Sequence, residues 1–351
     1  MNNDLAGRIE FVKTALSEHI GKEEQEQITL IEVLRINRRP FSTVVFLGVR
    51  THSRDRKMVM KVINHHPINR EVVESRNQAL VEYNILKELH PKFEKVEGCS
   101  VPCPILVVPE LETYVMEFVD GELLINELRW DRHLSSRKKY ARLQEHFHNC
   151  GRWLRIFQGF TGIQEVSSDV LAQSIERAES RLRLIEDARH PNCPKSLARI
   201  VKALLEDNWR QLSKVKVPVS GRHSDFHPLN ILAGENGITV IDFMGYSQDC
   251  IAVDGLSMLV HLEDERRSMT ASRRRVEGLR ERFLEGYGER PEIPMPVLFI
   301  CEAMQRIVSV WGSISALRGR LHHKWEAEAR IKTHIQWLMN EGERKYLWPS
   351  C

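Results

Sequence analysis

Apolar residues at helical spacing open the chain and then give way to short β-rich runs. The apolar positions of the first segment are Leu5, Ile9, Val12, Leu16 and Ile20. Their spacing predicts a helix over residues 4–20, with Asp4 as its N-cap. Further along, the pattern predicts strands over residues 28–36, 43–49, 58–63, 105–108 and 113–119, with one helix inserted over residues 69–90.

The pattern becomes mainly helical after Asp120 and Gly121. Helices are expected over residues 122–132, 136–160, 166–188, 195–215, 253–262, 268–287, 294–318 and 321–342. A β-rich island covers residues 217–220, 231–233 and 239–241. The sequence therefore predicts an α+β chain with a helical leader (1–27), a small strand-rich lobe (28–120) and a larger, mainly helical lobe (121–351).

Composition narrows the class of protein. With 351 residues, 42% of them hydrophobic and 28% charged, the chain has the length and composition of about two globular domains. The net charge of +3 is too small to indicate a nucleic-acid partner. The longest apolar run, around residues 295–301, is too short for a membrane span, and the amino terminus lacks the pattern of a secretory signal. Since the seven cysteines are scattered, we expect a cytoplasmic protein without a disulfide framework.

Three oxygen-bearing side chains in the larger lobe are the strongest candidates for chemistry. Asp225 and Asn230 lie five residues apart in a stretch that begins at His223, and Asp242 follows twelve residues after Asn230. A single Asp or Asn in a loop is usually a turn residue. Asp242, however, stands in an apolar, strand-like run, where strand propensity disfavours it and burial requires a partner. Taken together, the spacing favours a functional site.

The small lobe holds a second pair of candidates. Lys61 lies in the middle of an apolar predicted strand, where alternation places it on one face with Val59 and Ile63. Taken alone, it could equally be an edge-strand lysine that reaches solvent. Glu82 lies on an apolar stripe of the following helix, where a carboxylate needs a cationic partner. Lys61 is the expected partner.

These residues resemble the catalytic loop and metal-binding segment of the aminoglycoside phosphotransferase family, the small-molecule branch of the protein-kinase-like fold. The family pattern is His-Gly-Asp-x-x-x-x-Asn, followed by Ile-Asp after a hairpin. This chain departs from it at Ser224, where the family usually has Gly. The resemblance covers about residues 28–265. It implies a bilobal protein-kinase-like fold, with ATP and Mg²⁺ in a cleft near residues 119–122.

The resemblance also implies a role for each candidate. Asp225 would accept the proton of the attacking hydroxyl. Asn230 and Asp242 would offer the hard oxygen ligands that suit Mg²⁺, with the substrate phosphates completing the set. Lys61 would contact the α- and β-phosphates and would be held by Glu82.

Two further segments would contact the nucleotide. Residues 37–43 would form the phosphate-covering loop, in which Ser42 or backbone N–H groups could bind phosphate oxygens although the loop has no glycine. Residues 116–121 resemble the hinge, whose backbone at Glu117 and Val119 would hold the adenine edge.

Asp254 and His223 would give structural support. Asp254 resembles the family's structural Asp at the start of the next helix, where it would cap that helix and brace the catalytic loop. His223 in this pattern is a structural hydrogen-bonding residue. Asp254 follows Asp242 by only twelve positions, and the Ala-Pro-Glu motif of protein kinases is absent, which disfavours a peptide substrate.

The expected activity is transfer of the γ-phosphoryl group of ATP to a hydroxyl of a small molecule similar to an aminoglycoside, a sugar or an amino alcohol. Three alternatives stay open: a kinase for a sugar or lipid-linked glycan, a nucleotide-binding scaffold without catalysis, and a protein kinase with a reduced substrate platform. A carboxylate-lined pocket would favour a cationic acceptor. Glu263, Asp264 and Glu265 are the candidates for such a lining.

Overall fold

The computed structural model describes residues 2–39, 41–64, 77–131, 136–266, 272–317, 324–340 and 345–348. The chain divides into two units. The first unit comprises residues 1–121 together with residues 239–245, and the second comprises residues 122–238 and 246–351. A short segment that begins with the last run of the β-rich island thus belongs to the first unit, although it is more than 100 residues away along the chain.

An antiparallel sheet forms the centre of the first unit. Its strands are β1 (Ile28–Arg38), β2 (Ser42–Thr51), β3 (Asp55–Ile63), β5 (Pro104–Val108) and β6 (Thr113–Glu117), in the order β1-β2-β3-β6-β5. The unit also contains α1 (Asn2–Glu23), α2 (Gln78–Phe93), β4 (Gly98–Ser100) and η2 (Pro109–Leu111). All five strands predicted for this sheet are present. Residues 69–76 of the predicted helix lie outside the described residues, and the helix is observed from Gln78.

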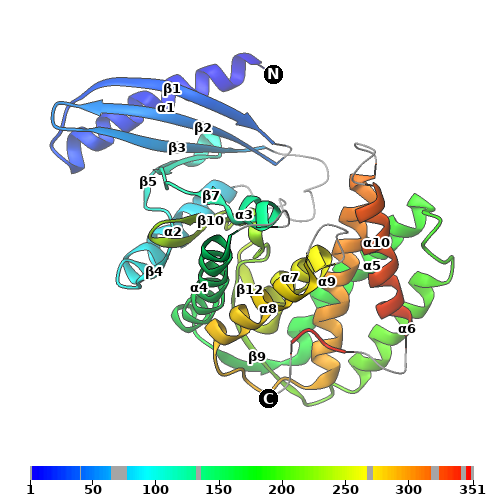
Figure 1. Cartoon of the computed structure of the whole chain (residues 1–351). Coiled ribbons are helices and arrows are strands. Elements are labelled where there is room, and N and C mark those ends of the chain that lie inside the picture. Colours follow the sequence, from blue (N-terminus) through cyan, green and yellow to red (C-terminus); the bar gives the residue numbers. More distant parts are fainter. Residues whose placement is uncertain are drawn as a thin grey trace. The chain divides into compact units, whose positions relative to one another are not determined.

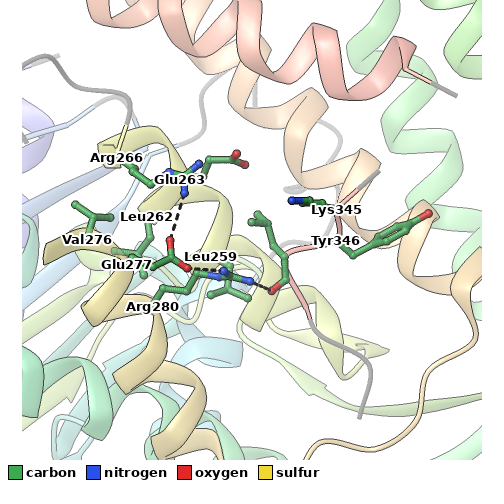
Figure 2. Close-up of a pocket in the computed structure, with 10 residues that line it drawn as sticks. Leu259, Leu262, Glu263, Arg266, Val276, Glu277, Arg280, Lys345 and Tyr346 are labelled. Carbon is green, nitrogen blue, oxygen red and sulfur yellow. Dashed lines mark hydrogen bonds and ion pairs between the residues drawn. The ribbon is translucent and has the colours of Figure 1, made fainter. Parts of the chain in front are cut away.

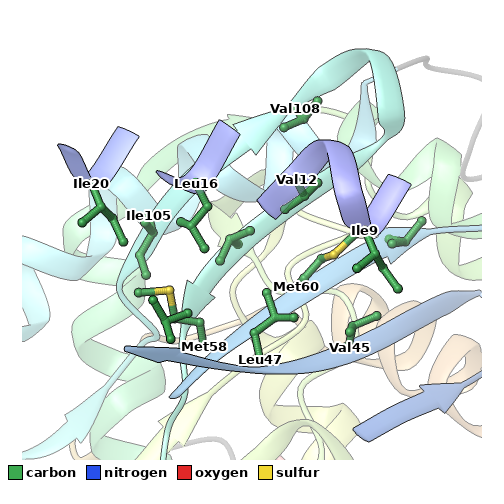
Figure 3. Packing of buried hydrophobic residues seen from close by; sticks show 13 residues of the cluster. Ile9, Val12, Leu16, Ile20, Val45, Leu47, Met58, Met60, Ile105 and Val108 are labelled. Carbon is green, nitrogen blue, oxygen red and sulfur yellow. The ribbon is translucent and has the colours of Figure 1, made fainter. Parts of the chain in front are cut away.

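The leader helix is part of the core of this unit. Four residues of α1 (Ile9, Val12, Leu16 and Ile20) are buried against the sheet, as Figure 3 shows. Their neighbours across the contact include Val45, Leu47 and Met58. The apolar stripe predicted for this segment therefore has a partner surface. The helix begins at Asn2, so Asp4 lies in its first turn and is not the predicted N-cap.

Strand β3 has two buried faces with different chemistry. Met58, Met60 and Val62 belong to the apolar cluster that α1 covers. Because successive side chains of a strand point to opposite faces, Lys61 lies on the other face, where it meets Glu82 of α2. The alternation that fills the core thus also positions an ammonium group.

The second unit is mainly helical. Its helices are α3 (Leu124–Asp131), α4 (Arg137–Thr161), α5 (Ala172–Ala188), α6 (Leu197–Arg210), α7 (Ala252–Arg266), α8 (Arg273–Tyr287), α9 (Met295–Ala316) and α10 (Lys324–Met339), with the 3-10 turns η3 (Ser168–Leu171) and η4 (Pro228–Asn230). Its strands are β7 (Glu122–Leu123), β8 (Gln164–Ser167), β9 (Lys216–Arg222), β10 (Ile231–Gly234) and β12 (Ser247–Cys250), and β11 (Gly237–Val240) leads from this unit into the first. Strands β8, β9 and β12 form one antiparallel sheet.

Glycines allow two helices of the second unit to pack closely (Figure 1). A Cβ atom on Gly151 of α4 would overlap the carbonyl oxygen of Phe283 in α8, and one on Gly286 of α8 would overlap the carbonyl oxygen of His148. Any larger residue at either position would push the two backbones apart.

Some expected boundaries in this unit are wrong. Residues 164–167 form strand β8, whereas the sequence pattern predicts a helix from residue 166. Helix α6 ends at Arg210, and Lys214 beyond it has a positive φ of 67°, so the predicted helix over residues 195–215 is too long. The predicted ends of α8 and α10 at residues 268–271, 321–323 and 341–342 lie outside the described residues.

Helix α9 is more apolar than the sequence analysis allowed. The window Met295–Ser315 has a mean hydropathy of 1.4, which is enough by length and composition for a membrane span. However, 78% of that window is buried against the rest of the protein. The helix therefore meets the criterion in the way that the core helix of a folded domain does.

Replacing Leu16 with alanine should lower the free energy of unfolding by about 2–5 kcal/mol, because the side chain is fully buried and its loss leaves a cavity. The matched control is Phe11→Ala on the same helix, where the side chain is 57% exposed and the expected change is about 0.5 kcal/mol or less. Urea denaturation of both variants measures the difference. Equal effects would show that α1 does not pack on the sheet.

Candidate active site

In the first unit, one ammonium group binds two carboxylates. Lys61 Nζ lies 2.9 Å from each carboxylate oxygen of Glu82 and 2.9 Å from Oδ1 of Asp242. Glu82 Oε1 also accepts the backbone N–H of Phe243 at 2.8 Å. We call Lys61, Glu82 and Asp242 the lysine cluster. The sequence predicted the contact between Lys61 and Glu82, but gave no sign of the hydrogen bond to Phe243.

The lysine cluster joins a buried ion pair to a second, more exposed carboxylate. Lys61 is 5% exposed and Glu82 is fully buried. Desolvation disfavours the ammonium form of Lys61, but Asp242 and Glu82 outweigh it and raise the pKa of Lys61 above its ordinary value. Lys61 therefore stays charged at neutral pH. Desolvation raises the pKa of Glu82 above its ordinary value, although Lys61 opposes this shift, and Asp242 is the most exposed of the three.

The sequence analysis placed Asp242 in a strand-like run, but in the structure it does not lie in a strand. Strand β11 ends at Val240, and Asp242 has a φ of 72°, in the left-handed region that Asp tolerates better than most residues. The backbone turns there because Phe243 N–H is held by Glu82 and the Asp242 carboxylate is held by Lys61. The residue is thus placed by the lysine cluster and not by strand pairing.

The predicted phosphate-covering loop is a tighter turn than expected. Strands β1 and β2 extend into the predicted loop, where Arg38 pairs with Thr43. The backbone N–H of Arg39 donates to the carbonyl oxygen of Ser42 across the turn. Ser42 itself is almost fully buried at the start of β2, and Pro40 lies outside the described residues. Most of the seven-residue segment is therefore paired strand.

The predicted hinge follows strand β6. The backbone N–H of Glu117 already donates to the carbonyl oxygen of Cys103, and that of Phe118 donates to Lys57. In the described part of the chain, the N–H of Val119 has no hydrogen-bond partner. Of the two positions proposed for adenine, Val119 can therefore offer its N–H, whereas Glu117 cannot.

In the second unit, the segment 223–230, which we call the Asp225 loop, carries the other candidates. The side chain of Asp225 is 61% exposed, yet both of its oxygens are held. His227 Nε2 lies 2.8 Å from Oδ1, and Asn230 Nδ2 lies 2.7 Å from Oδ2. Desolvation within the loop opposes ionisation, but His227 and then Asn230 lower the pKa of Asp225 below its ordinary value. The carboxylate is therefore ionised, exposed and fixed in orientation.

Side chains of α7 and α4 contact the Asp225 loop and hold its backbone and its buried rings. Asp254 accepts the backbone N–H groups of both His223 and Ser224. Asp254 is the third residue of α7, so it braces the loop from within the helix and does not cap it, contrary to the capping prediction. His223 is fully buried, and the adjacent Phe226 ring stacks on Trp153 of α4 at 5.4 Å. The exposed Asp225 thus lies between two residues of the loop, His223 and Phe226, that are fully buried.

The chemistry of the donor set fits a hard cation. Asn230 uses its amide nitrogen for two hydrogen bonds to Asp225, one to the carbonyl oxygen and one to the carboxylate, which leaves the amide oxygen for another partner. Asp242 keeps one carboxylate oxygen beyond its contact with Lys61. Among the described residues there is no group of three His, Cys, Asp or Glu side chains that could hold a metal by itself. Asn230 and Asp242 therefore each keep one side-chain oxygen of the kind that a hard cation prefers.

The acidic residues considered for a cationic acceptor all have internal partners. Glu263 lies 2.8 Å from Arg306, Asp264 lies 2.6 Å from His334, and Glu265 lies 3.2 Å from Arg330.

A pocket of about 140 Å³ lies in the second unit between α7, α8 and residues 345–347 (Figure 2). Arg266 and Arg280 on its wall both form ion pairs with Glu277. The α7 residues that line it lie about a third of a turn around the helix from Asp254, which contacts the Asp225 loop. The pocket is therefore on a different face of α7 from the candidate active site.

Sequence reasoning missed two residues of this site, His227 and His261. The rings of His227 and of His261 in α7 stack at a centroid distance of 5.7 Å with an angle of 21°. The position of His227, two residues after Asp225, was a usable signal. His261 is more than 30 residues further along, and nothing in the local pattern connects it to the loop.

Comparisons with known proteins identify the family and the fold of the chain. Residues 43–296 match the Phosphotransferase enzyme family. No curated protein matches the chain. Similar solved structures include a glucosamine kinase in complex with glucosamine, ADP and inorganic phosphate, with a TM-score of 0.58, 14% identity, and coverage of 87% of this chain and 81% of that chain. A choline kinase from Cryptosporidium parvum Iowa II has a TM-score of 0.55, 14% identity, and coverage of 93% and 94%.

An amicoumacin kinase in complex with AMP-PNP, Ca²⁺ and Ami also has a TM-score of 0.55, with 13% identity and coverage of 100% of this chain and 98% of that chain. The fold is α+β and protein-kinase-like, as the sequence predicted, and the protein is a phosphotransferase. The chain belongs to the Phosphotransferase enzyme family, whose pattern matches more than half of its length.

Asp254 should make the protein less stable as the pH rises from about 4 to 6. Burial raises the pKa of Asp254 to about 6, against an ordinary value of 3.8. Between these values the unfolded chain releases the proton while the folded chain keeps it, so ionisation favours unfolding by up to about 3 kcal/mol at pH 7. Urea denaturation at pH 4.5 and pH 7 measures the slope. Asp254→Asn should remove this slope, and an unchanged slope in the variant would assign it to another group.

Ser224→Gly should stabilise the protein by about 0.5–1 kcal/mol. Ser224 has a φ of 76°, which costs a residue with a Cβ atom about 1–2 kcal/mol, and the larger backbone entropy of glycine offsets part of the gain. Ser224→Ala is the control, because it keeps the Cβ and removes only the hydroxyl. Thermal or urea unfolding compares the three proteins, and a stabilising alanine variant would contradict the backbone explanation.

Proposed function

We propose that this phosphotransferase moves the γ-phosphoryl group of ATP to a hydroxyl of a small molecule, with Mg²⁺ as the metal cofactor. The observation that carries the proposal is Asp225, an exposed, ionised carboxylate with a hydrogen-bond donor on each oxygen. A group held in this way can accept a proton from a hydroxyl without first reorienting.

In the proposed reaction the acceptor oxygen forms a bond to the γ-phosphorus while the bond between that phosphorus and the β,γ-bridging oxygen breaks. The proton of the hydroxyl passes to Asp225, and ADP leaves. Bound Mg²⁺ would supply neutralisation of the triphosphate charge, with Asn230 and Asp242 as its protein ligands. Lys61, kept charged and held by Glu82, would bind phosphate oxygens, and the N–H of Val119 would hold the adenine edge.

The proposed acceptor class is a small hydroxylated molecule such as a sugar, an amino alcohol or an aminoglycoside. Structures of the same fold include a glucosamine kinase, a choline kinase and an amicoumacin kinase, which supports testing these chemistries first. The described cysteines are all free thiols, which supports a cytoplasmic location.

Asp225→Asn should reduce turnover about 10²–10⁴-fold, because the amide cannot accept the proton, while nucleotide binding is kept. Asp242→Ala should instead abolish the Mg²⁺-dependent thermal shift produced by ATP. Turnover is measured with a panel of amino sugars, amino alcohols and aminoglycosides, and binding is measured by thermal shift with and without Mg²⁺. An Asp225→Asn variant with parental turnover, or a parent protein that transfers no phosphoryl group to any acceptor, would refute the proposed function.

A further inference from the structure

Two of the contacts of His227 indicate which of its ring nitrogens carries a proton. The backbone N–H of Leu229 donates to Nδ1 at 3.3 Å, so Nδ1 must carry a lone pair. Nε2 then carries the proton and donates it to Oδ1 of Asp225 at 2.8 Å. A neutral imidazole in this one tautomer satisfies both contacts.

The two sides of Asp225 are held by donors of different kinds. Asn230 holds Oδ2, but its amide oxygen is also the proposed metal ligand, so its position depends on the metal as well. His227 holds Oδ1 and has no such second duty. With one donor on each oxygen, the plane of the exposed carboxylate is fixed, and the remaining lone pairs are left for an incoming hydroxyl.

The His227 ring is itself held by the stack on His261. The buried Nε2 of His261 has no hydrogen-bond partner in the described residues, so its ring acts on His227 through its flat face. Desolvation lowers the pKa of His261 to about 3, so its ring is neutral and the stack does not bring two cations together. His261 and Asp254 lie seven residues apart, on one face of α7.

Helix α7 therefore supports the Asp225 loop at two points. Asp254 holds the backbone at His223 and Ser224, before Asp225 in the sequence, and His261 holds the side chain of His227 after it. We propose that His227 is a positioning residue for Asp225 and that His261 fixes the plane of the His227 ring. The inference rests on the proposed function, because it gives His227 a part in the same reaction.

A matched pair of variants separates this role from a purely structural one. Asn at position 227 places an acceptor where Nδ1 was, so it keeps the contact with Leu229 N–H but cannot reach Asp225. Gln places an N–H near the position of Nε2, so it keeps the donor to Asp225 and loses the contact with Leu229. We expect His227→Asn to lower kcat about 10–100-fold with the KM for ATP unchanged, and His227→Gln to retain activity within about 5-fold of the parent. The opposite order would show that His227 only shapes the turn.

His261 is tested in the same way. His261→Phe keeps a flat ring, whereas His261→Ala removes it, so kcat should fall several-fold in the alanine variant and stay near the parental value in the phenylalanine variant. Equal losses in both would show that a ring nitrogen is needed and would overturn the stacking role. Thermal unfolding of each variant shows whether it is folded before its kinetics are compared.

One measurement needs no acceptor. In protein labelled with ¹⁵N-histidine, the His227 signals, assigned by their absence in His227→Gln, should show a protonated Nε2 and an unprotonated Nδ1. A protonated Nδ1 would overturn the inference at the level of geometry. A parent protein without turnover would refute the proposed function, whereas an active parent together with an equally active His227→Asn variant would refute only the positioning role.

Discussion

The burial of one ammonium group constrains the first unit more than any other feature. An unpaired Lys61 would be strongly destabilising at its position between β3 and α2, and removal of either carboxylate would leave a buried charge without compensation. Pairing with Glu82 and Asp242 brings together three segments that are far apart in the sequence. The same carboxylate of Glu82 also binds the backbone after Asp242. The need to compensate the buried charge of Lys61 therefore sets the position of Asp242, the side chain proposed to hold a metal.

The Asp225 loop differs from the lysine cluster, since its key carboxylate is exposed and burial does not hold it in place. Neighbouring residues of the loop are buried instead: His223 and Phe226 are fully buried, and Asp254 accepts two consecutive backbone N–H groups. These contacts over-determine the backbone, which explains how Ser224 persists with a φ of 76°, a value typical of glycine. Asp242 in the first unit has a φ of 72° and is held by Lys61. Strain at both positions is offset by hydrogen bonds to buried carboxylates.

The parts of the site that follow from local periodicity could be predicted from the sequence. Strand alternation and a helical stripe placed Lys61 and Glu82 on the faces of their own elements, and together with the family resemblance they predicted the pair. Contacts that depend on tertiary geometry could not be predicted. Examples are the backbone turn at Asp242, the pairing of Arg38 with Thr43 that shortens the expected loop, and the stack of His227 on His261. Each requires knowledge of which backbone groups are free, and a sequence pattern does not contain that information.

Charge counting along the sequence also overstated the case for a cationic acceptor. The acidic run in the sequence consists of Glu263, Asp264 and Glu265. In the structure, α9 and α10 supply their partners, which are Arg306, His334 and Arg330. Glu265 and Arg306 are almost fully buried, so these ion pairs belong to the packing of the three helices. A polycationic acceptor would have to compete with them for the same carboxylates, and breaking a buried pair is strongly unfavourable. Recognition of an acceptor by these three residues is therefore disfavoured, even though the run of acids suggests it.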